Sequence, residues 1–280
     1  MSRRDAGPTD PGREGPAAPD PLEGLIGRSL GLEVHDVLRE PLGVDSGVER
    51  ERVRFVAAGA ERTLLFERMS PRRALEVQLL PFLARKTDRV PAVHARGIPP
   101  RHLPAPQWLL LEDLADSGSA CDGDVRAVLD AKLEVERAVA KDGPALRALG
   151  VRERGPQAIA SEIADAVAGR PGADEISAEA RECARRIAKL PVALVHGDLR
   201  CGSALSTDRG VVLRRWGGAY IGCALLDVVR LVADVVERGE AVLGIGLPRL
   251  YAERVGVVLP TEVLRGAERL DRLALRYLDR

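Results

Sequence analysis

Cysteine and histidine side chains are the most reactive groups in the chain, so their spacing gives the first indication of its chemistry. Four cysteines are scattered without a CxxC pair: Cys121, Cys183, Cys201 and Cys223. Such scattered cysteines are typical of free thiols in a reduced cytoplasm. Cys201 would be reactive if neighbouring arginines lowered its pKa, but we favour a packed, inert thiol. No metal site is predicted, because three of the histidines lack Cys or His partners at ligand spacing: His35, His94 and His102.

The composition excludes several classes of partner. The 280 residues suffice for one large domain or for two lobes that share a cleft. Lys+Arg and Asp+Glu both number 42, which removes the usual electrostatic argument for a nucleic-acid or anionic-membrane partner. No apolar run reaches membrane-spanning length, and the first residues contain no apolar signal-peptide core. We therefore expect a cytoplasmic protein with no nucleic-acid or membrane partner.

The pattern of apolar residues changes along the chain, and this change predicts two lobes. Residues 1–21 are rich in Pro, Gly, Asp and Arg and are predicted to form a disordered tail. Residues 22–114 contain short strand patterns, one helix and the buried strand Trp108–Leu111. Residues 115–280 show mainly helical spacing. The prediction is an α+β molecule with a small β-rich N-terminal lobe, ending in a hinge, and a larger helical C-terminal lobe.

Four segments occur in an order that resembles a known family. Leu194–Gly202 reads LVHGDLRCG, and Val211–Trp216 (VVLRRW) follows it. Ile221–Val228 (IGCALLDV) comes next, and LLLEDL at Leu109–Leu114 lies upstream. They resemble the HGDLHxGN loop, the hydrophobic-Asp-Trp strand, the GDPxxDLA helix start and the interlobe hinge of aminoglycoside phosphotransferases and choline kinases. The resemblance covers nearly the whole chain and implies a two-lobed, protein-kinase-like fold.

The resemblance implies a role for each matching residue. Asp198 stands where the family has the Asp that positions the acceptor hydroxyl, with His196 beside it. Glu76, on the first helix after the strands, matches the ion-pairing Glu of the family. Asp227 matches an Asp that braces the loop rather than taking part in catalysis. The hinge would hold adenine through the backbone groups of three residues: Glu112, Asp113 and Leu114.

The groups that hold ATP and magnesium in the family are missing from the matching positions. The strand Lys is replaced by Glu67, the magnesium-binding Asn by Ser203 and the magnesium-binding Asp by Arg215. Two of these losses do not depend on the alignment, because no lysine precedes Lys86 and the chain contains no asparagine. A guanidinium is not equivalent to a compact ammonium, and it offers magnesium no oxygen ligand. This degenerate nucleotide site predicts a pseudokinase without a cofactor, while ATP without magnesium stays open.

Glu67 and Arg215 also look like a pair whose charges have been exchanged. In the family, the strand Lys and the metal-binding Asp face each other across the cleft. We therefore expect Glu67 and Arg215 to meet directly or through water, with their charged ends within about 8 Å of each other. The alternative is that each residue drifted independently in an abandoned site.

Three functions are compatible with this pattern. The first, which we predict, is a non-catalytic scaffold that binds a peptide or a partner enzyme. Relatives of the fold act on precursor peptides in bacterial natural-product pathways, so the resemblance implies that context. The second is an active phosphotransferase that uses Asp198 and arginines, in place of the usual Lys and metals, to phosphorylate a hydroxyl of a small molecule or precursor peptide. The third is a nucleotide sensor that binds adenine at the hinge without metal or turnover.

Overall fold

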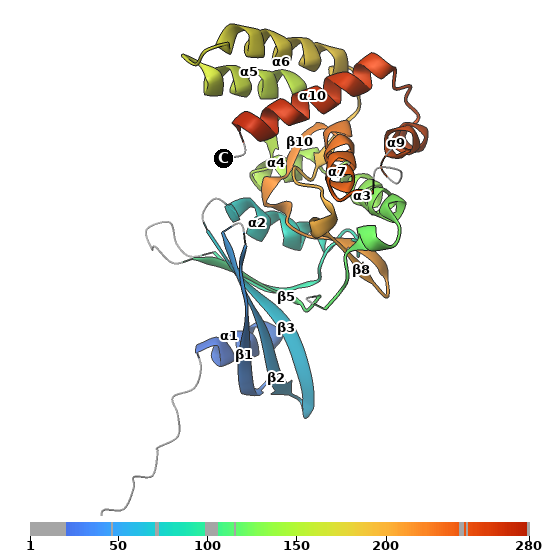
Figure 1. Ribbon diagram of the computed structural model, residues 1–280. Helices are drawn as coiled ribbons and strands as arrows, with labels where there is room; N and C mark the ends of the chain where they lie inside the picture. The colour runs from blue at the N-terminus through green and yellow to red at the C-terminus, as the bar shows by residue number, and fades with distance from the viewer. Residues whose placement is uncertain are drawn as a thin grey trace, which may run out of the picture.

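The computed structural model describes residues 21–45, 47–70, 73–98, 106–114, 116–240, 244 and 246–278. It divides into a β-rich lobe, in the lower half of Figure 1, and a helical lobe, in the upper half. The predicted tail lies outside the described residues, except for Pro21, which is the first residue of helix α1 (Pro21–Leu30).

The small lobe is a five-stranded antiparallel sheet with one helix on each face. Its strand order is β1-β2-β3-β5-β4. Helix α1 covers one face, where it packs on Phe55, Phe66 and Leu110, and helix α2 packs against the opposite face, where Leu65 and Leu109 lie. The alternation of side chains along each strand explains this division, since successive residues point to opposite faces. The elements are β1 (Val34–Asp45), β2 (Val48–Ala57), β3 (Ala60–Met69), α2 (Ala74–Leu83), β4 (Val93–Gly97) and β5 (Gln107–Glu112).

The large lobe consists of helices around a small three-stranded sheet, β6-β10-β7, and a separate hairpin, β8-β9. Its helices are α3 (Val125–Val139), α4 (Gly143–Ala148), α5 (Pro156–Val167), α6 (Ala173–Ile187), α7 (Leu225–Glu237), α9 (Leu247–Val255) and α10 (Thr261–Tyr277). Its strands are β6 (Arg152–Glu153), β7 (Val192–Val195), β8 (Ala204–Thr207), β9 (Gly210–Leu213) and β10 (Tyr220–Cys223). Three 3-10 turns complete it: η2 (Ala120–Asp122), η3 (Cys201–Ser203) and η4 (Trp216–Gly218).

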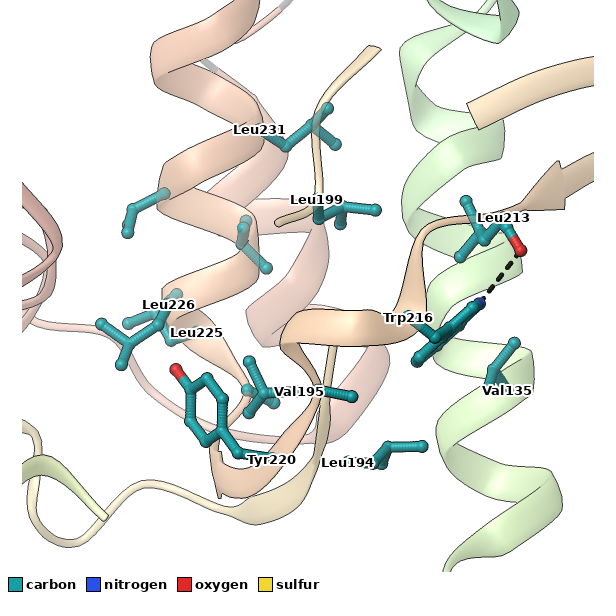
Figure 2. Packing of buried hydrophobic residues seen from close by; sticks show 14 of the residues in the cluster. Val135, Leu194, Val195, Leu199, Leu213, Trp216, Tyr220, Leu225, Leu226 and Leu231 are labelled. Carbon is teal, nitrogen blue, oxygen red and sulfur yellow. Dashed lines mark hydrogen bonds between the residues drawn. The ribbon is translucent and has the colours of Figure 1, made fainter. Parts of the chain in front are cut away.

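One apolar core runs through both lobes. The cluster that contains Leu65 and Leu80 of the small lobe also contains Leu129 and Trp216 of the large lobe. Trp216 is buried, and its indole Nε1–H donates to the carbonyl of Leu213 at 3.0 Å, so its polar atom is satisfied inside the core (Figure 2). The core therefore holds the segment that follows β9 in a fixed position between the lobes.

The predicted α+β, two-lobed fold class is confirmed, and the predicted short strands of the small lobe include one of twelve residues. Strand β1 is long: it runs to Asp45, past Pro41 and Gly43, through two register irregularities in its pairing with β2. Such irregularities let turn residues remain inside an edge strand. In the described part of the chain, no helix is long and apolar enough to cross a membrane.

Candidate active site

The HGD loop after β7 is held by a buried carboxylate. Asp227, at the start of α7, accepts the backbone N–H of His196 at 2.6 Å and that of Gly197 at 3.0 Å. Gly197 has φ +82°, and a Cβ there would lie 2.1 Å from the carbonyl oxygen of Gly218, so only glycine fits. Asp227 is 1% exposed. The predicted bracing role of Asp227 is confirmed.

Two further side chains fix the same loop from α7. Arg230 donates to the carbonyl oxygen of Gly197 and pairs with Asp271 of α10 at 2.7 Å. Asp234 accepts the backbone N–H of Cys201 at 2.8 Å. Three positions of α7, counting Asp227, therefore hold the loop backbone, and none of them needs a bound metal to do so.

The cysteines correct the prediction of four free thiols. Cys121 and Cys201 form a disulfide whose Cα atoms are 5.4 Å apart, which joins η2 to the HGD loop. Residues 80 positions apart carry no sequence signal for such a bond, because only the fold brings η2 beside the loop. Cys183 and Cys223 are free and buried, and burial raises the pKa of Cys223 to about 11. The inert thiol expected at Cys201 is thus a bonded sulfur, while the two remaining thiols are shielded.

His196 faces the protein rather than the cleft. Its side chain is fully buried, its Nδ1 accepts the backbone N–H of Asp198 at 3.2 Å, and its Nε2 contacts the carbonyl oxygen of Arg214 at 2.8 Å. Because a carbonyl can only accept, Nε2 carries the proton of a neutral imidazole. Burial lowers the pKa of His196 accordingly. His196 is therefore a loop-shaping residue.

Asp198 is partly exposed, and a neighbouring cation engages its carboxylate. Arg200 Nε donates to Asp198 Oδ1 at 2.9 Å, so an acceptor hydroxyl would have to displace or share this partner. Ser203, at the position of the family's Asn, is buried: its Oγ accepts the N–H of Arg200 at 3.0 Å and donates to the carbonyl of Arg200 at 2.8 Å. The serine closes the loop on itself instead of offering a ligand to the cleft.

Glu67 has a neighbour on its own sheet as an ion-pair partner. It pairs with Arg50 at 2.7 Å. The reason is register, because Arg50 and Glu67 stand directly opposite each other on β2 and β3. The expected meeting of Glu67 with Arg215, directly or through water, stays a prediction, and both residues line one cavity of about 10 Å³. Arg215 lines the same cavity as Glu67 with a left-handed backbone, φ +71°, which is uncommon for a residue with a Cβ.

Glu76 binds a backbone N–H group, although no lysine stands at the position where the family has its strand Lys. Its Oε1 accepts the N–H of Trp216 at 2.9 Å, and its Oε2 lies 3.5 Å from Nη1 of Arg73. Burial, with the nearby charge of Glu67 as the second cause, raises the pKa of Glu76 to about 7. A second carboxylate where a lysine would stand thus makes ionisation of Glu76 harder.

The hinge side chains are also occupied. Arg52 of β2 donates through Nε to Asp113 at 2.7 Å and through Nη2 to Asp116 at 2.8 Å. Glu112 binds Arg209, from the β8–β9 turn, through both carboxylate oxygens, with Nη1–Oε2 at 2.8 Å. Both arginines therefore bring charge to the segment that was predicted to hold adenine.

The space left between these groups is small. The interlobe cavity encloses about 10 Å³, and its walls include five predicted site residues: Glu67, Glu76, Glu112, Leu114 and Arg215. This volume is about that of one water molecule, whereas pockets for nucleotide-sized ligands are on the order of 300–1,000 Å³. The structure thus brings these five predicted residues together in a space that does not fit a magnesium-nucleotide, whereas Asp113, His196 and Asp198 are not among its walls.

Three site residues were missed at the sequence level: Arg50, Arg52 and Arg209. The segment Val48–Arg54 (VERERVR) alternates acid and base, which is typical of a solvated strand. In the structure Arg50 and Arg52 share the face toward the cleft, and Arg52 is 8% exposed. The strict alternation itself was the available signal, because it places both arginines on one face.

The two lobes, the interlobe hinge and the braced HGD loop define a protein-kinase-like architecture. An aminoglycoside-3'-phosphotransferase of type VIII superimposes with a TM-score of 0.58 at 19% identity, over 90% of this chain and 97% of that chain. Aminoglycoside phosphotransferase APH(3'')-Id from Streptomyces rimosus gives 0.55 at 17%, over 90% and 95%. A choline/ethanolamine kinase family protein from Mesorhizobium loti gives 0.55 at 18%, over 85% and 76%.

These comparisons concern the fold. No family model matches the sequence, and no curated protein matches it. The chain therefore has the fold of aminoglycoside phosphotransferases and choline/ethanolamine kinases, as its motifs predicted, at sequence identities below 20%.

Proposed function

We propose that the protein is a catalytically impaired, phosphotransferase-like pseudokinase that acts as a binding or scaffold protein. The observation that carries this proposal is the filled cleft: the interlobe cavity encloses about 10 Å³ where a nucleotide would need several hundred. The side chains around it are paired with one another, as in Arg50–Glu67 and Arg52–Asp113. Admitting a nucleotide would require breaking ion pairs that are shielded from water, which is costly.

The residues around the cleft support the same proposal. Ser203 uses its hydroxyl within the loop, Arg215 brings a cation to the position of a magnesium ligand, and Arg200 neutralises Asp198. Electrostatic stabilisation of a transferring phosphoryl group requires cations aimed at the phosphate and carboxylates that hold the metal. Here Arg200 already occupies the carboxylate of Asp198. The loop is therefore better suited to a structural role than to catalysis.

We propose a peptide or a partner enzyme as the ligand of this scaffold, in a natural-product biosynthetic setting. Support for a scaffold comes from the loop, which Asp227, Arg230 and Asp234 hold independently of any metal. A partner that binds a flexible surface loses part of the binding free energy to the entropy cost of ordering that surface. A rigid surface avoids this cost.

The test is a calorimetric titration of the purified protein with ATP, with and without magnesium. We expect no binding in either condition. Binding only without magnesium would instead favour a nucleotide sensor. Magnesium-dependent binding would overturn the proposal and favour an active phosphotransferase, whose turnover Asp198→Ala should abolish.

A paired variant tests whether the cleft is closed by its side chains. Arg52→Ala removes the guanidinium that engages Asp113, whereas Arg54→Ala removes an exposed arginine from the same strand. If the filled cleft prevents binding, only Arg52→Ala should gain any affinity for ATP without magnesium. An equal gain in Arg54→Ala would show that the arginine network is not what excludes the nucleotide.

A further inference from the structure

A larger pocket lies beside the filled cleft, between the start of α2 and the large lobe. It encloses about 650 Å³ between the start of α2, the short strand β6, helix α5, the end of α10 and the segment that follows Trp216. Leu75, Leu278 and Ala219 give it apolar walls, and Gly217 and Gly218 form part of its lining without side chains. Its volume falls within the range of pockets that hold small ligands or a few peptide residues, about 300–1,000 Å³.

The two acidic side chains that the described residues contribute to this pocket are each paired with an arginine. Glu162 of α5 binds Arg154 at 2.6 Å, and the Arg154 guanidinium also lies over the ring of Tyr220 at 5.4 Å. Glu153 binds Arg147 at 2.6 Å. Neither carboxylate is therefore left to attract a cationic ligand.

Arg152 is the charged wall residue that remains. It is exposed at the start of β6, and among the described residues it makes neither an ion pair nor a side-chain hydrogen bond. A guanidinium without a partner among the described residues, beside an apolar wall in a partly enclosed pocket, is a favourable site for a carboxylate, which it can bind through two parallel hydrogen bonds.

The strand that carries Arg152 also offers backbone groups. In the described sheet β6-β10-β7, strand β6 pairs with β10 on one side only, in parallel register, with Tyr220 opposite Arg152. An edge strand can accept an extended peptide through main-chain hydrogen bonds, while a neighbouring pocket selects its side chains. A peptide therefore fits the pocket better than a carboxylate without amide groups.

We infer that this pocket, the Arg152 pocket, binds an extended acidic peptide, with a Glu or Asp carboxylate on Arg152 and an apolar neighbour against Leu75 and Leu278. The inference rests on the proposed scaffold function and gives that function a ligand-binding surface. It requires neither nucleotide nor metal, because none of the pocket residues belongs to the filled cleft.

The test uses two pools of fluorescent hexapeptides with blocked ends, built from Ala, Leu, Val and Gly around one central residue. That residue is Glu in the first pool and Gln in the second, so the pools differ by a single charge. Fluorescence polarisation should show that the full-length protein binds the Glu pool about tenfold more tightly, as a charge-assisted hydrogen bond predicts. Equal binding of the two pools, or binding of neither, would overturn the inference.

Variants locate the effect. Arg152→Ala should abolish the preference for the Glu pool, whereas Arg181→Ala, which removes an exposed arginine of α6 outside the pocket, should keep it. Arg152→Gln retains most of the side-chain stem and replaces the alanine variant if that variant unfolds. A preference that survives both Arg152 substitutions would place the peptide elsewhere and refute the pocket.

The peptide experiment and the nucleotide experiment test the two proposals independently of each other. Loss of the peptide result, while ATP still does not bind, would refute the Arg152 pocket and leave the pseudokinase proposal standing. Magnesium-dependent ATP binding, together with an Arg152-dependent peptide preference, would refute the pseudokinase and keep the pocket.

Discussion

Replacing Glu76 by glutamine removes one ionisable group while leaving a buried acceptor for the backbone N–H of Trp216. Burial and the neighbouring Glu67 raise the pKa of Glu76 from its ordinary 4.5 to about 7. This difference corresponds to about 3 kcal/mol between the two protonation states. The carboxyl is protonated in both folded and unfolded chains below pH 4.5 and ionised in both above pH 7. The folded state therefore loses up to about 3 kcal/mol as the pH rises through this window.

Urea unfolding of wild type and Glu76→Gln between pH 5 and pH 8 measures the effect. The two proteins should be nearly equal in unfolding free energy at pH 5, and the variant should be more stable by about 2–3 kcal/mol at pH 8. His94 and His196 have lowered pKa values, so they favour the folded state as pH rises. Because both histidines are present in both proteins, their contribution cancels in the difference. Parallel pH profiles for the two proteins would refute a titrating Glu76.

Two further predictions concern the HGD loop. Reducing the Cys121–Cys201 disulfide, or replacing both cysteines by serine, should lower the unfolding free energy by about 4 kcal/mol, because the bond closes a loop of 80 residues. Guanidinium unfolding with and without reductant measures this loss. Identical unfolding midpoints would contradict the prediction. Gly197→Ala should cost about 3 kcal/mol or more, since its Cβ would meet a carbonyl at 2.1 Å, whereas Gly202→Ala, with no atom within 4 Å, should stay within about 0.5 kcal/mol. Similar losses in the two glycine variants would contradict the steric argument.

The bracing role of Asp227 was implied by the family resemblance, and the structure supplies its physical reason. A buried carboxylate needs hydrogen-bond donors, and Asp227 finds them in the backbone of the HGD loop. The order of the HGD loop, the Trp strand and the hinge was likewise enough to predict two lobes. These features are local, and each one constrains its neighbours in sequence.

The occupied cleft could not be predicted in the same way. Whether Glu67 meets Arg50 or Arg215 depends on the register of β2 against β3 and on the distance across the cleft, and neither is encoded locally. The Cys121–Cys201 bond likewise depends on how the lobe folds η2 onto the HGD loop. The pairing of Glu67 with Arg50 follows only from the way the strands align.

The arginine at the tip of the β8–β9 hairpin has a consequence for motion. Kinase-like enzymes open and close about their hinge on microsecond-to-millisecond timescales. Here Arg209 holds Glu112 at the hinge itself, and one apolar core passes from Leu65 and Leu80 into the helical lobe. The lobes should consequently move as one body. A molecule with a single accessible shape cannot choose among partners by shifting its conformational populations, so the chemistry of its outer surface alone must decide which of them it binds.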